Sequence, residues 1–144
     1  MIAMIEQIHW SHSIGINLPH HRDFERVAEK TWKEFVNRLS RMLKAKPERM
    51  LWFATFEHGP SGSNPHLHAL IGGPSRALNE HEMQASCVSI KQAMQVPRIM
   101  AEGFENGPNA ISYLFKERES SLDDDRWPMP SPNIPETLRR RRRM

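Results

Sequence analysis

The sequence predicts an α+β fold of the ferredoxin-like or RRM-like sandwich type. This is a mostly antiparallel sheet of about four or five strands, with helices on one face and a site on the open face. Two observations support it. Segments with strand and helix patterns follow one another in the order strand, helix, strand, strand, helix, strand, helix. The chain has 144 residues, 38% of them hydrophobic, which is enough for one domain with a single core.

The first half of the chain contains three predicted strands and the strongest helix. Residues 8–18 alternate between apolar and polar side chains, which indicates a half-buried strand. Residues 22–46 place apolar side chains at three- and four-residue spacing, which indicates an amphipathic helix that ends before Pro47. Residues 50–58 are apolar on both faces, as is typical of a central strand, and we expect residues 65–72 to pair with them.

The second half continues with a helix, a strand and another helix. Asn79, followed three residues later by Glu82, has the pattern of a helix start, and a modest apolar stripe extends to about residue 95. Residues 98–104 are expected to form a short strand. Residues 109–119 follow a turn and show the periodicity of a final helix.

The composition divides the chain at residue 119. Residues 1–119 form the predicted folded domain, and residues 120–144 form a Pro-rich tail that we expect to be extended or disordered. The net charge of +3 depends on Arg139–Arg143 within that tail. A basic run of this kind favours nucleic acid, but it also occurs in localisation signals and in solvated chain ends.

Cysteine content and hydropathy indicate a cytoplasmic protein. Cys87 is the single cysteine, so the chain has no internal disulfide and no Cys-rich structural zinc site. No apolar segment has the length of a membrane helix, and the amino terminus lacks the pattern of a signal peptide. We therefore expect no membrane partner.

A candidate metal site lies where the third predicted strand begins. His66 and His68 share one face of that strand, because successive side chains point to opposite faces. A hairpin with the preceding strand brings Glu57 beside them, and two imidazoles with one carboxylate can hold a divalent ion with positions left for a substrate. His58 is an alternative third ligand. The commoner explanation of such a histidine pair is two exposed or hydrogen-bonded side chains.

A second group of polar side chains lies on the last predicted helix. Tyr113, the single tyrosine of the chain, and Lys116 are three residues apart and project from the same side, together with Asn109. Taken alone, this spacing is explained by a half-buried tyrosine and a solvated lysine.

Together these motifs resemble the HUH superfamily of single-strand DNA endonucleases, in particular the replication-initiator (Rep) nicking domain with one catalytic tyrosine. The matching segments are His66-Leu67-His68, the strand end at Glu57, and Tyr113-Leu114-Phe115-Lys116. The tyrosine follows the histidine pair, as in Rep proteins and HUH transposases, whereas relaxases have the reverse order. A loose match to the weak first motif of the family ends at Asn17.

The resemblance implies site-specific nicking and joining of single-stranded DNA through a 5′-phosphotyrosine, which initiates rolling-circle replication of a plasmid, phage or small virus. It implies Mg²⁺ or Mn²⁺ bound by Glu57, His66 and His68, with Tyr113 as the nucleophile and Lys116 beside it. The implied partners are single-stranded or stem-loop origin DNA and the host replication machinery. A protein of a eukaryotic virus would be nuclear.

DNA would lie on the open sheet face and the nearby loops. The candidate DNA contacts are Asn17, Lys91, Arg98, Asn109, Arg139, Arg140 and Arg141. Trp10 or Trp52 would stack on bases if exposed, although a place in the core is the commoner fate of a tryptophan.

Three other functions deserve comparison. An HUH transposase shares the chemistry. A non-catalytic nucleic-acid-binding module of ferredoxin-like fold would bind through the sheet and the arginine tail without metal. A histidine-triad nucleotide-processing enzyme requires a third alternating histidine, and Leu70 occupies that position.

Overall fold

A computed structural model of the chain describes residues 10–19, 24–46, 50–57, 65–72, 80–104 and 129–131. Its elements, in chain order, are β1 (His12–Asn17), α2 (Phe24–Met42), β2 (Leu51–Glu57), β3 (His66–Gly72), α3 (Glu80–Met94), β4 (Arg98–Gly103) and β5 (Met129–Pro130). Each predicted strand and helix between residues 8 and 104 is present. The helix expected over 109–119 lies outside the described residues.

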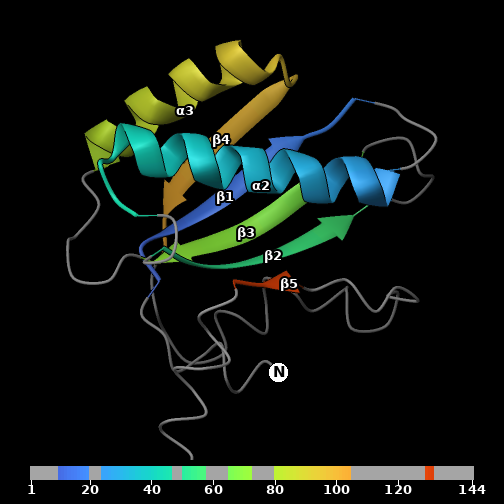
Figure 1. The fold of residues 1–144 in the computed structure, drawn as a ribbon, viewed down its shortest axis with the longest axis horizontal. Coiled ribbons are helices and arrows are strands. Elements are labelled where there is room, and N and C mark those ends of the chain that lie inside the picture. The colour runs from blue at the N-terminus through green and yellow to red at the C-terminus, as the bar shows by residue number, and fades with distance from the viewer. Residues whose placement is uncertain are drawn as a thin grey trace, which may run out of the picture.

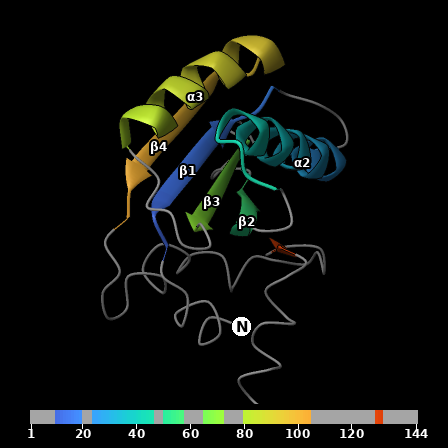
Figure 2. The ribbon, with the colours of Figure 1, turned by 60° about the vertical axis from the view of Figure 1, so that its left-hand side comes forward.

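The strands form one sheet in the order β4-β1-β3-β2-β5, and every neighbouring pair is antiparallel. Since β1 and β2 are both antiparallel to β3, they run parallel to each other, and α2 connects them across it. Both helices cover the same face of the sheet (Figures 1 and 2). This arrangement confirms the predicted α+β, ferredoxin-like sandwich.

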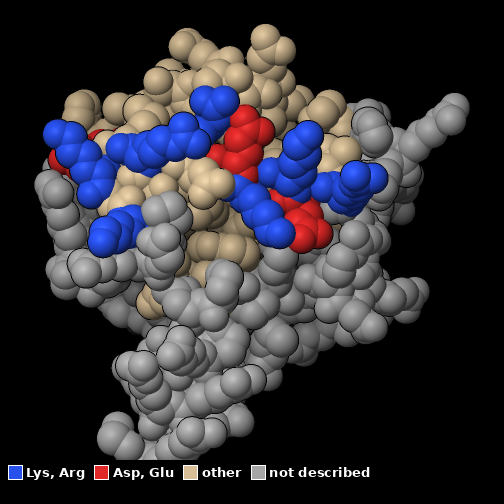
Figure 3. All heavy atoms as spheres, viewed as in Figure 1, with Lys and Arg blue, Asp and Glu red and all other residues tan. Residues whose placement is uncertain are grey.

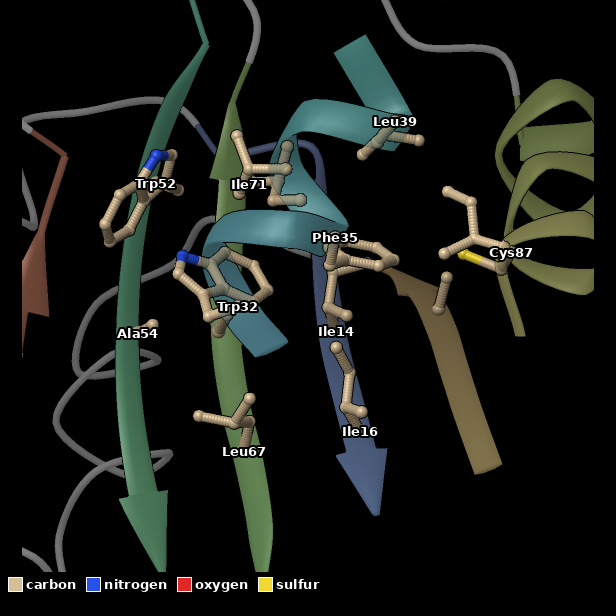
Figure 4. Close-up of a cluster of buried hydrophobic side chains, with 14 of the residues drawn as sticks. Ile14, Ile16, Trp32, Phe35, Leu39, Trp52, Ala54, Leu67, Ile71 and Cys87 are labelled. Carbon is tan, nitrogen blue, oxygen red and sulfur yellow. The ribbon is translucent and has the colours of Figure 1, made fainter. Parts of the chain in front are cut away.

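The main core lies between the sheet and the two helices. Alternate residues of the strands point into it, among them Ile14, Leu67 and Trp52. From α2, Trp32 stacks on Phe35 with ring centroids 5.3 Å apart and meets Trp52 edge-on at 5.6 Å (Figure 4). Burial of such large side chains is the dominant favourable term in folding.

Both tryptophans that were considered for base stacking are buried. Trp10 is fully inaccessible and Trp52 is 7% exposed. Neither ring is therefore available to a nucleobase, and the interpretation of these residues as core is confirmed.

The opposite face of the sheet, called here the second face, is only partly open. Phe53, Thr55 and Leu70 point to this side and are at most 2% exposed, whereas the end of the sheet that carries Glu57 and His66 is accessible. The expectation that β2 is central because both its faces are apolar is wrong. β2 lies next to the edge, and burial on both faces does not require a central position.

The outer edge of β2 is covered by a segment from the far end of the chain. Ser131 donates its backbone N–H to the Trp52 carbonyl at 2.8 Å, and its hydroxyl oxygen accepts the Trp52 N–H at 3.1 Å. Of residues 120–144, the structure describes 129–131, and Met129–Pro130 among them form the strand β5. The proposed boundary at residue 119 lies outside the described residues.

In the described part of the chain, neither helix combines the length and hydropathy needed to cross a bilayer.

Each helix is followed, within two residues, by a residue other than glycine in the left-handed backbone conformation. At the end of α2, Lys44 has φ of 55°, and the N–H of Ala45 bonds to the Ser40 carbonyl at 2.8 Å, which is the pattern of a Schellman motif. At the end of α3, Gln95 has φ of 56° and donates to the Lys91 carbonyl at 2.9 Å. This conformation is strained for residues with a Cβ atom.

We expect Gln95→Gly to raise the free energy of unfolding by about 0.5–1 kcal/mol, because glycine adopts positive φ without strain. Urea denaturation measures the change. The matched control is Gln92→Gly, at an exposed position within α3, which should lower stability by about 1 kcal/mol. A loss of stability in Gln95→Gly would contradict the strain at this position.

Candidate metal centre

The pairing of β2 with β3 determines which side chains meet at the accessible end of the second face. Glu57 lies directly opposite His66, and Thr55 lies directly opposite His68. Directly opposed residues on one face have Cβ atoms about 4.5–5.5 Å apart, so their side chains make contact. Leu67, between the two histidines, is fully buried in the main core and so fixes which face they occupy.

The ligand atoms of Glu57, His66 and His68 converge. His66 Nε2 donates to Glu57 Oε2 at 2.9 Å, and His68 Nε2 lies 3.8 Å from the same oxygen. The two imidazole rings meet edge-to-face, with centroids 4.7 Å apart and an interplanar angle of 82°. One ligand atom from each residue lies within 4.8 Å of the other two.

This arrangement fits the ligand set of a divalent ion. Two atoms that each bind one ion at about 2.1 Å are about 3 Å apart when adjacent and at most about 4.2 Å apart when opposite. The 2.9 and 3.8 Å separations fall within that range, and one ligand atom from each residue lies within 4.8 Å of the other two. Mixed nitrogen and oxygen ligation does not by itself select Mg²⁺ or Mn²⁺ over Zn²⁺.

The three side chains are reachable from solvent. Their exposed fractions are 17% for His66, 29% for Glu57 and 38% for His68. A bound ion would therefore be accessible to a substrate, as a catalytic site requires and a closed structural site does not.

Two other predicted residues share the row of side chains that contains His66. Asn17 pairs with His66 on the side away from Glu57, and Arg98 pairs with Asn17 on β4. The row across the second face is therefore Glu57, His66, Asn17, Arg98. Arg98 is exposed, so its guanidinium can reach a phosphate that lies on this face.

Lys91 does not belong to this face. It is an exposed residue near the end of α3, on the helix layer, at the flank of the buried stripe of Met83, Cys87 and Ile90. Lys91 was expected to contact DNA bound on the second face, and its position on the helix layer does not support that contact. The remaining predicted site residues lie outside the described residues: His58, Asn109, Tyr113, Lys116, Arg139, Arg140 and Arg141.

The sequence did not reveal Gly15 as a neighbour of the site. Gly15 lies beside His68 on β1, and a Cβ atom placed there would meet nothing within 4 Å. Among the residues that the structure describes, none therefore fills the space over Gly15 next to His68. The only signal in the sequence was a glycine in an alternating strand, which indicates close approach of another backbone or a ligand.

Two further titratable groups belong to the core. His12 is 3% exposed on the helix side of β1, and burial lowers its pKa, an effect that Glu80 partly opposes. Burial also raises the pKa of the Cys87 thiol to about 11. Cys87 is therefore a protonated, unreactive thiol and not a candidate nucleophile.

No known protein family and no curated protein matches the amino-acid sequence. The function is therefore argued from the fold, the geometry of the candidate metal centre and the motifs.

We expect Mn²⁺ to raise the melting temperature of the protein through Glu57, His66 and His68. An ion that binds only the folded state adds about 2.7 kcal/mol to the free energy of unfolding when its free concentration is about 100 times its Kd. Differential scanning fluorimetry of wild type, Glu57→Gln and His68→Ala measures the shift, which both variants should lose. His81→Ala, which removes an exposed histidine from α3, should keep it. A full shift in His68→Ala would place the ion elsewhere.

His12 should make stability depend on pH below about 6.5. The unfolded chain binds a proton on His12 near that ordinary value, whereas the folded chain binds it only at lower pH, so stability falls as the pH falls between the two pKa values. Urea denaturation at neutral and mildly acidic pH should show a smaller loss for His12→Gln than for wild type. His81→Gln, at an exposed position, should behave as wild type. An equal loss in His12→Gln would argue against this role.

Proposed function

We propose that this chain is a metal-dependent single-strand DNA endonuclease of the replication-initiator type. It would nick and rejoin DNA through a covalent link to Tyr113. The observation that carries the proposal is the convergence of Glu57, His66 and His68 on the accessible end of the second face. The Tyr113 and Lys116 motif supports it from the sequence.

In this proposal the residues of the centre hold the metal ion, and their neighbours on the sheet hold the DNA. A divalent ion held by Glu57, His66 and His68 supplies Lewis-acid activation of the scissile phosphate. Without an ion, Glu57 and His66 are joined by their hydrogen bond, and an ion bound between them would take the place of its proton. Asn17 and Arg98, which continue the row across the sheet, would hold phosphates next to the scissile one.

The substrate strand needs room to approach the centre. No described residue fills the space over Gly15 beside His68, and the Met100 that pairs with Gly15 is 40% exposed. The sugar–phosphate backbone of the DNA can therefore lie close to β1 at Gly15. A larger side chain at residue 15 would occupy the same space.

The chemical step is a transesterification. The Tyr113 oxygen forms a bond to phosphorus as the bond from phosphorus to the 3′ oxygen breaks, which leaves a 5′-phosphotyrosine and a 3′-hydroxyl. The phenol proton passes to solvent, the departing 3′ oxygen takes up a proton from solvent, and the positive charge of Lys116 would favour the phenolate. The 3′-hydroxyl can prime synthesis, and reversal of the step rejoins the strand. A transposase of the same superfamily would use the same step.

We expect wild-type protein to form a covalent adduct with single-stranded or stem-loop DNA only when Mg²⁺ or Mn²⁺ is present. Tyr113→Phe should lower adduct formation by at least about a thousandfold, because the nucleophile is lost. Denaturing gels with end-labelled oligonucleotides give the readout.

The metal-induced melting shift is the control, because Tyr113→Phe should keep it while His68→Ala loses both the shift and the adduct. Cleavage by Tyr113→Phe would refute the assignment of the nucleophile. DNA binding without an adduct across a library of origin-like stem-loops would instead favour the non-catalytic binding module.

A further inference from the structure

The outward side of α2 carries a line of six polar positions, five of them cations, here called the α2 basic stripe. Its positions are spaced by four, three, four, four and three residues, so they share one side of the helix. They are Arg26, Lys30, Lys33, Asn37, Arg41 and Lys44, the last of which lies just beyond the end of α2.

All six positions of the stripe are exposed. The side of α2 that faces the sheet is apolar and buried, since Trp32, Phe35 and Leu39 are fully buried there. Within the part of α2 whose side chains are described, the exposed positions without a cation are Asn37 and Met42. Lys and Arg side chains correspondingly cross the molecular surface over α2 (Figure 3).

The charge on this surface is one-sided. Seven cations and two anions lie between Arg26 and Lys46. The anions, Glu29 and Glu34, are half-buried, and each forms an ion pair four residues along the helix, at 2.9 Å and 3.1 Å. No described acidic residue forms an ion pair with Lys30, Arg41 or Lys44. A helix side that only keeps a protein in solution normally mixes both signs.

The dimensions of the stripe fit a linear polyanion. At 1.5 Å per residue, the distance along the axis from Arg26 to Arg41 is about 22 Å. Successive positions on one helix side are about 5–6 Å apart. A nucleic acid presents regularly spaced phosphates over the same length, and charge neutralisation by lysine and arginine drives binding to it.

The absence of exposed rings selects the form of nucleic acid. Single-strand sites combine a basic groove with aromatic side chains that stack on bases. The two aromatic residues between Arg26 and Lys44, Trp32 and Phe35, are buried. We therefore propose that the α2 basic stripe binds the sugar–phosphate backbone of duplex DNA without reading its sequence.

The stripe and the candidate metal centre lie on opposite sides of the sheet (Figure 2). Duplex DNA on α2 would therefore be held apart from single-stranded DNA bound at His66 and His68. The proposal goes beyond the proposed function and does not require that the chain nicks DNA.

The test measures binding of the full chain to a short fluorescent duplex of arbitrary sequence, by anisotropy over a series of salt concentrations. The triple variant Lys30→Gln/Arg41→Gln/Lys44→Gln should reduce the slope of log affinity against log salt by about 2–3. At moderate salt its affinity should be lower by at least about tenfold. Melting temperatures establish that each variant is folded.

Two controls separate position from total charge. The variant Lys30→Arg/Arg41→Lys/Lys44→Arg keeps the charges and should bind as wild type. Arg38→Gln removes one charge beside the stripe, where Arg38 is paired with Glu34, and should change affinity less than Lys30→Gln does.

An unchanged slope in the triple variant would overturn the proposal, as would an equal loss of affinity for single-stranded DNA of the same length. Displacement of the duplex by polyglutamate at matched charge concentration would indicate an acidic protein partner instead, and would also overturn it. Tyr113→Phe should bind the duplex normally. Failure of the nicking reaction and failure of duplex binding are therefore separate outcomes.

Discussion

The register between β2 and β3 is the constraint on which the candidate site depends. It places Glu57 opposite His66, and it does so because Leu67 and its partner Phe56 are buried on the helix side of the same two strands. A shift of one residue in either strand would expose these apolar side chains and turn the polar ligands toward the core. The free energy that favours the hydrophobic core thus also favours the geometry of the polar site, although the two lie on opposite faces.

The sheet separates two environments with different chemistry. On the helix side, Ile14, Leu67 and Trp52 pack against α2 and α3, and the titratable groups there are shifted toward their neutral forms by burial. At the open end of the second face, two imidazoles and a carboxylate remain in reach of solvent. α2 repeats the division on a smaller scale, since one of its sides supplies the core and the other carries cations. A chain of this size can therefore present two distinct polar surfaces around one core.

The periodicity of apolar residues, together with the proline and glycine residues that end the elements, predicted most of the fold. The alternation in residues 8–18 and the strong amphipathic pattern of residues 22–46 correspond to β1 and α2, because one face of each element is buried. The histidine pair and Glu57 could be placed on one face for the same reason. The residues that lie beside this site but come from strands distant in the sequence could not be predicted in this way. Gly15 beside His68 and Arg98 beside Asn17 depend on the pairing of β1 with β3 and β4, which brings together residues distant in sequence. The position of β2 near the edge was missed because apolar residues on both faces are compatible with any strand that is covered on both sides.

The contact of Ser131 with Trp52 has a consequence for the behaviour of shortened chains. An unpaired outer strand offers a row of N–H and carbonyl groups on which another molecule can assemble. Here Met129, Pro130 and Ser131 cover the part of that row at residues 52–54 of β2, and Pro130 has no N–H with which to extend it further. A fragment that ends before residue 129 would lose this cover over residues 52–54 of β2. Self-association through the sheet is then expected of the fragment.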